Sequence, residues 1–136
     1  GVVNRIAKYK DKTDGWRSEG ISDETHAIFQ RFAGENLDDK SAAALMWYSR
    51  NVLFYEKGLD NNPNVMLVKY EDLVTQPEVE AKRVFDFLGL VYSPWHTRHL
   101  FSTSIGRRAE PHLIKGVREI CDGLLERYAA TLATAR

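Results

Sequence analysis

Four consecutive apolar residues, VMLV at 65–68, constrain the fold of this 136-residue chain more than any other stretch. The run is short and rich in β-branched residues, and it lies between an Asn/Pro turn and polar residues that begin at Tyr70. This pattern predicts a β-strand over about residues 65–70 that is buried on both faces, as in a parallel sheet. Because buried backbone N–H and C=O groups need partners, such a strand requires neighbouring strands.

The rest of the chain is typical of helices and loops. Apolar residues recur at helical spacing over 2–9, 23–33, 39–57, 78–88 and 113–132. Ser22 is placed to cap the second of these helices, and Thr75 with Glu78 forms a capping-box pair before the fourth. Gly89 suits the left-handed position that ends the fourth helix, with Leu90 folding back onto it.

No second convincing strand accompanies residues 65–70. We therefore expect the sheet partners to lie in residues outside this sequence or in another chain. The alternative is an all-α domain, in which the short apolar run would have no evident role.

The composition limits the class of protein and the partners that the chain could bind. The apolar fraction of 43% and the charged fraction of 28% are typical of a soluble globular protein. The 19 basic and 19 acidic residues cancel, so no overall field attracts nucleic acid or an anionic membrane, and any anion site is local. The single cysteine, Cys121, excludes an internal disulfide and is expected in the core. No membrane span or signal peptide is found, so we expect a cytoplasmic protein or, alternatively, the luminal domain of a membrane-anchored enzyme.

Two stretches could bind a ligand. Tyr70 lies at the carboxyl end of the predicted strand, where parallel sheets bind ligands, and its ring and hydroxyl could contact a base or sugar; simple packing is the alternative. The loop STSIGRR at 102–108 combines hydroxyls, a glycine and two arginines, which suits a phosphate or sulfate; a solvated basic loop is the alternative. Arg5 and Lys8 form a small cationic edge on the first helix. The four histidines lack metal-ligand spacing, so no metal site is expected.

Three stretches in order resemble the C-terminal half of sulfotransferases that use 3′-phosphoadenosine 5′-phosphosulfate. VMLVKYEDLVTQPEVEAKRVFDFLGL at 65–90 is very like the family's strand–YEDL–helix–FLGL block. GVVNRIAKYK at 1–10 is similar to the residues that come after the family's R-D-P-R sequence, and TSIGRRAEP at 103–111 is similar to its S-K-G-R loop.

The resemblance implies an α/β, P-loop-like fold with a central parallel sheet and flanking helices, to which this chain supplies mainly helices and one strand. It also implies that residues 1–136 form the C-terminal portion of a single domain. It implies that Tyr70 contacts the adenine of the co-substrate. It implies that Ser104, Gly106 and Arg107 bind the 3′-phosphate, with Ile105 standing where the family has lysine. Arg5 takes the position of a serine that commonly binds the same phosphate.

The resemblance also implies an activity: transfer of a sulfuryl group to a hydroxyl or amine of a small-molecule, lipid or carbohydrate acceptor, without a metal. The family's phosphosulfate loop and its usual catalytic base would precede residue 1, so the catalytic residues are unknown and this chain alone should be inactive. Two alternatives stay open: a P-loop nucleotide kinase-like phosphotransferase, and a non-enzymatic helical interaction module.

Overall fold

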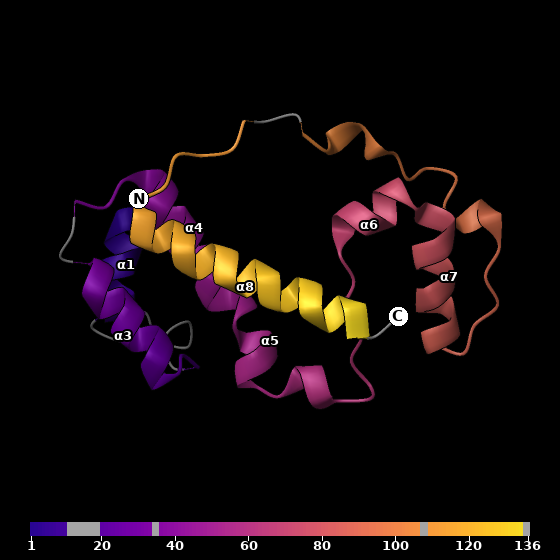
Figure 1. Cartoon of the computed structure of the whole chain (residues 1–136), viewed down its shortest axis with the longest axis horizontal. Helices are drawn as coiled ribbons and strands as arrows, with labels where there is room; N and C mark the ends of the chain where they lie inside the picture. The colour runs from indigo at the N-terminus through magenta and orange to yellow at the C-terminus, as the bar shows by residue number, and fades with distance from the viewer. Residues whose placement is uncertain (11–19, 34–35, 107–108, 135–136) are drawn as a thin grey trace.

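The computed structural model of the chain describes residues 1–10, 20–33, 36–106 and 109–134, which form helices joined by loops (Figure 1). The α-helices are α1 (Val2–Lys10), α3 (Asp23–Phe32), α4 (Asp39–Asn51), α5 (Leu53–Glu56), α6 (Tyr70–Thr75), α7 (Pro77–Phe87) and α8 (Lys115–Thr134). The described residues also form three short 3-10 helices: η1 (Leu59–Asn61), η2 (Pro94–His96) and η3 (Ser102–Ser104). Within the described ranges no residue is assigned to a strand.

Helices α1, α3, α4 and α8 pack together and form what we call the helical cluster (Figure 1). Their apolar stripes meet in a core of fully or nearly fully buried residues: Ile6, Phe29, Phe32, Ala42, Leu45, Val117 and Cys121. The burial of Cys121 confirms its predicted place in the core. None of the described helices has the length and apolar character needed to cross a membrane.

A second, aromatic cluster extends the core along α8. Val52, Tyr55 and Leu124 are buried there, and the rings of Phe54 and Tyr128 pack against them. The Tyr55 hydroxyl lies 2.8 Å from the Thr131 hydroxyl, so α5 is fixed to α8 by both packing and a hydrogen bond.

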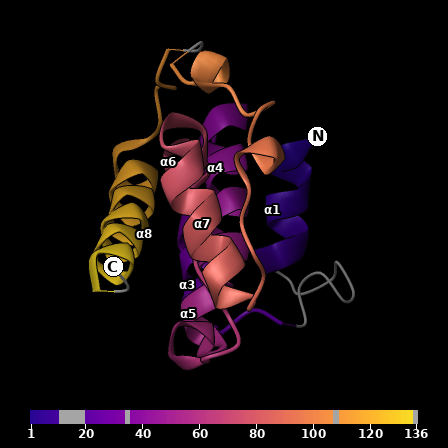
Figure 2. The same ribbon diagram turned by 90° about the vertical axis from the view of Figure 1, so that its right-hand side faces the viewer.

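Helices α6 and α7 pack on each other at the opposite end of the molecule from α1, and we call them the α6–α7 unit (Figure 1). Seen from that side in Figure 2, the unit and the chain after α7 form the near face of the molecule. Helix α6 also contacts η3, so segments about thirty residues apart meet here.

Local signals explain several helix ends. The Ser22 hydroxyl accepts the Thr25 N–H at 3.0 Å, as predicted for the cap of α3. The Asp38 carboxylate accepts the N–H groups of Lys40 and Ser41, both at 2.8 Å, and caps α4. Gly89 has a positive φ of 67°, and the Leu90 N–H donates to the Phe85 carbonyl at 2.8 Å, which confirms the predicted end of α7.

Three expectations are wrong in detail. Residue 70 does not end a strand: it begins α6, and residues 65–69 before it are not paired with any strand among the described residues. The capping box does not form, because Thr75 is the last residue of α6 and its hydroxyl donates back to the Glu71 carbonyl at 2.7 Å. The third predicted helix is interrupted at Val52, which separates α4 from α5.

Candidate nucleotide-binding site

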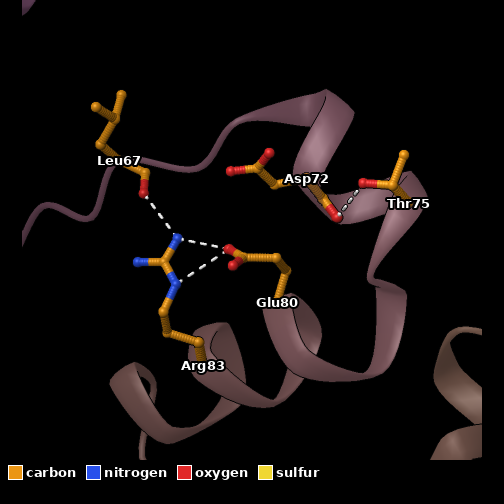
Figure 3. Close-up of polar contacts among 5 residues, drawn as sticks. All are labelled: Leu67, Asp72, Thr75, Glu80 and Arg83. Carbon is orange, nitrogen blue, oxygen red and sulfur yellow. Dashed lines mark hydrogen bonds and ion pairs between the residues drawn. The ribbon is translucent and has the colours of Figure 1, made fainter. Parts of the chain in front are cut away.

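The segment before Tyr70 is held by an ion pair on α7. The Arg83 guanidinium donates to the Glu80 carboxylate through Nε at 3.1 Å and Nη2 at 2.8 Å, and Nη2 also donates to the Leu67 carbonyl at 3.1 Å (Figure 3). Glu80 is only 2% exposed, so its charge is compensated inside the fold rather than by water. The arginine therefore clamps residues 65–69 onto α7; we call Leu67, Glu80 and Arg83 the Arg83 clamp.

The clamp lies beside the start of α6. Figure 3 shows the Asp72 side chain extending from α6 on the side where Leu67 and Arg83 lie, while the Thr75 hydroxyl reaches the Asp72 carbonyl at 3.4 Å. Asp72 and Glu71 are also the acidic residues of the first turn of α6, where they favour the positive end of the helix dipole. The polar residues after the apolar run thus begin a helix.

Tyr70 is the first residue of α6 and is 57% exposed. Lys69 before it has extended backbone angles, φ −92° and ψ 125°, so the chain turns from an extended path into the helix at Tyr70. The aromatic ring is therefore exposed at the surface, directly after the segment that the Arg83 clamp holds. A flat, accessible ring at a fixed position suits stacking on a base.

The structure brings the helix that begins at Tyr70 into contact with one part of the predicted phosphate loop. Helix α6 contacts η3, which contains Ser104, and the Ile105 N–H closes the turn by donating to the Ser102 carbonyl at 3.0 Å. Gly106 has a positive φ of 71°, and a Cβ added there would meet no other atom within 4 Å, so its backbone is open to approach. The side chain of Ser104 and the whole of Arg107 lie outside the described residues.

Arg5 is placed differently. It belongs to α1, which packs against α3 and α4 in the helical cluster, at the other end of the molecule from α6 (Figure 1). Its side chain lies outside the described part of the structure. Among the elements that carry predicted site residues, the structure thus brings α6, which begins at Tyr70, against η3, which contains Ser104, and leaves the helix of Arg5 apart.

Sequence reasoning missed the Arg83 clamp. The signal was present, because Glu80 and Arg83 are spaced i, i+3 on a helix and Glu80 adjoins Ala81 of the predicted apolar face. What the spacing could not reveal is the third member, the Leu67 carbonyl, which comes from a segment sixteen residues away.

The clamped segment borders a cavity of about 340 Å³, a volume within the range of small-molecule sites. It is lined by Phe54, Asp60, Val65, Met66, Leu67, Arg83, Phe87 and Thr131. Most of these side chains are apolar, and the cavity joins α5, α7 and α8.

Two other side chains with functional groups, Glu56 and Cys121, have roles in the fold. The Glu56 carboxylate accepts hydrogen bonds from the hydroxyls of Ser22 and Thr25, which ties α5 to the start of α3. Burial raises the pKa of the Cys121 thiol to about 11, so at neutral pH it is protonated and unreactive. In the described part of the chain, no group of three or more His, Cys, Asp or Glu side chains could hold a metal ion.

A family model described as "Sulfotransferase domain" matches residues 8–105. The match covers well over half of the chain and includes the Arg83 clamp, Tyr70 and the contact between α6 and η3. No curated protein and no solved structure matches the chain. The chain belongs to the sulfotransferase domain family.

Proposed function

We propose that this chain takes part in transferring a sulfuryl group from 3′-phosphoadenosine 5′-phosphosulfate to a hydroxyl or amine acceptor. The observation that carries the proposal is the family match over residues 8–105, which spans the Arg83 clamp and Tyr70. The acceptor would be a small molecule, a lipid or a carbohydrate.

In this proposal Tyr70 stacks on the adenine of the co-substrate. Its exposure and its place at the start of α6 support this role. The loop at 104–107 would bind the 3′-phosphate: Gly106 allows close approach of the backbone, and the Arg107 guanidinium can donate two parallel hydrogen bonds to phosphate oxygens. Arg5 is assigned to the same phosphate by resemblance alone, since α1 packs away from α6.

The reaction would form a bond between the acceptor oxygen or nitrogen and sulfur as the bond from sulfur to the bridging phosphate oxygen breaks. The acceptor proton passes to a base, and the leaving phosphate needs cationic stabilisation. We assign neither the base nor that cation to a described residue. We propose that both come from residues outside this sequence, together with strands that pair with residues 65–69 in a P-loop-like parallel sheet.

Nucleotide binding tests the proposal. Adenosine 3′,5′-bisphosphate should raise the melting temperature of the chain, or bind in calorimetry, far more strongly than 5′-AMP, because only the former carries the 3′-phosphate. Tyr70→Ala should weaken its binding about ten-fold or more through lost stacking. Arg107→Gln should weaken binding of the bisphosphate and leave binding of 5′-AMP unchanged.

The charge-matched control is Lys115→Gln, which removes one positive charge from a 91% exposed side chain on α8. It should leave both affinities unchanged. Equal binding of the two nucleotides, or an equal loss in Arg107→Gln and Lys115→Gln, would contradict a 3′-phosphate site in this loop.

A further inference from the structure

The chain that follows α7 exposes an unusual amount of apolar surface. In residues 88–101, which we call the 88–101 segment, five large apolar side chains are each more than half exposed: Leu88, Leu90, Val91, Trp95 and Phe101, with Val91 at 90%. The segment lies on the outer face of the molecule, beside α7 and away from the helical cluster (Figures 1 and 2). Exposed apolar side chains gathered in one segment point to an interaction site.

The same part of the chain carries positive charge without negative charge. Residues 87–109 contain no aspartate or glutamate, and their fixed charges are Arg98, Arg107 and Arg108. The acidic residues that flank this stretch are already paired: Asp86 lies 2.6 Å from Lys82, and Glu110 lies 2.8 Å from Arg118. Within residues 88–101 the fixed charge is therefore the positive charge of Arg98, although the chain as a whole is neutral.

Packing against α7 holds the segment in shape. The Phe85 ring contacts the rings of Tyr92, at 5.7 Å between centroids, and His96, at 4.7 Å. The Tyr92 hydroxyl lies 2.8 Å from that of Thr97, which is itself buried. The large apolar side chains named above nevertheless stay exposed.

Trp95 and Arg98 form a pair at this surface. The guanidinium carbon of Arg98 lies 3.0 Å from the centroid of the Trp95 ring, and its Nε donates to the His99 ring at 3.0 Å. Trp95 is nevertheless 66% exposed, so much of the indole remains accessible while the cation is held close to it.

We propose that the 88–101 segment docks onto an anionic membrane surface. Tryptophan and arginine favour the headgroup region, where the indole and the guanidinium both find partners, while neighbouring aliphatic side chains reach the acyl chains. An apolar protein partner would instead desolvate Arg98 with no carboxylate from the segment to compensate it. The exposed Arg98 and the exposed apolar side chains of the same segment match a lipid surface that is both apolar and negatively charged.

Vesicle binding tests this proposal independently of nucleotide binding. The chain should sediment with phosphatidylcholine vesicles that contain phosphatidylserine and bind pure phosphatidylcholine vesicles much more weakly, and the tryptophan emission should shift to shorter wavelength. Trp95→Ser should lower the partition coefficient about ten-fold. Arg98→Gln should lower it about five-fold, and only for the anionic vesicles.

Two variants serve as matched controls. Trp47→Ser removes the partly exposed tryptophan of α4 in the helical cluster, and Lys115→Gln removes a distant positive charge. Both should keep the wild-type partition coefficient. The proposal is overturned if neither vesicle type binds the chain, or if the control variants lose as much binding as Trp95→Ser and Arg98→Gln. Self-association that Trp95→Ser abolishes would assign the face to a second copy of the chain and would also overturn it.

Discussion

Replacing Arg83 by methionine should destabilise the α6–α7 unit far more than replacing its neighbour Lys82 does. Arg83 makes three hydrogen bonds, two to a carboxylate that is 2% exposed and one to the Leu67 carbonyl. Breaking a buried ion pair from one side costs about 3–5 kcal/mol. The Arg83 side chain is 20% exposed and methionine keeps its apolar packing, so we expect the lower end, about 3 kcal/mol.

Lys82 provides the control on the same helix. Its ion pair with Asp86 has side chains that are 64% and 60% exposed, so Lys82→Met should cost about 0.5 kcal/mol or less. Urea unfolding followed by far-UV circular dichroism measures both changes. In a thermal scan Arg83→Met should melt about 10 °C below the parent, because a chain of this size loses roughly 4 °C for each kcal/mol.

The double variant Glu80→Leu with Arg83→Met separates charge from packing. Removing both charges leaves no uncompensated carboxylate, so the double variant should recover much of the lost free energy of unfolding. The reasoning is refuted if Arg83→Met and Lys82→Met differ by less than about 0.5 kcal/mol, which is the largest cost expected for an exposed pair. A double variant as unstable as Arg83→Met alone would show that packing, not charge, sets the cost.

Two further predictions concern the helical cluster. Hydrogen bonds from the Ser41 backbone and side chain hold the pKa of the Asp38 carboxyl below its ordinary value, so the stability it contributes is present above the unfolded-state value near pH 3.9 and is lost as pH falls through the folded-state value. Asp38→Asn keeps the cap, and its urea midpoint should fall less steeply with pH in this acid range; equal slopes for the variant and the parent would contradict this. Gly123→Ala should stabilise α8 by about 1 kcal/mol through helix propensity, whereas Gly116→Ala should destabilise it, because the new Cβ would lie 3.0 Å from Cζ of buried Phe32. Equal urea midpoints for the two alanine variants would show that the contact with Phe32 yields without cost.

Helices with local stop and start signals were predictable. Ser22 and Asp38 cap α3 and α4 through their own side chains, and Gly89 ends α7 in a left-handed conformation. Each of these signals acts within a few residues of the helix end, so the sequence pattern contains all the information required.

The segment at 65–70 shows a limit of prediction from local sequence patterns. Its β-branched residues fit an extended chain, but whether they form a strand depends on partners far away in sequence. The end of the extended stretch could have been placed better, because Glu71 and Asp72 are acidic residues of the kind that favour the first turn of a helix. The capping box predicted at Thr75 was wrong for a related reason. The Thr75 hydroxyl can donate to a carbonyl of the preceding turn as readily as it can cap the next helix.

The candidate site was predictable only in part. Tyr70 stands out in the sequence because it follows the apolar run, and the resemblance joins it to the loop at 104–107. The contact between α6 and η3 is non-local, and no spacing rule could have given it. The Arg83 clamp likewise depends on a carbonyl from another segment.

The hydrogen bonds of residues 65–69 indicate which edge of this segment a further strand could join. In an extended chain, the N–H and C=O of one residue point to the same side, and successive residues alternate. The odd-numbered residues each have a bond within the chain: the Val65 N–H to the Asn62 carbonyl, the Leu67 carbonyl to Arg83, and the Lys69 carbonyl to the Leu73 N–H. Met66 and Val68 have none among the described residues, although both side chains are half-buried. In the parallel sheet proposed above, a pairing strand would therefore add through Met66 and Val68, on the edge that the Arg83 clamp leaves open.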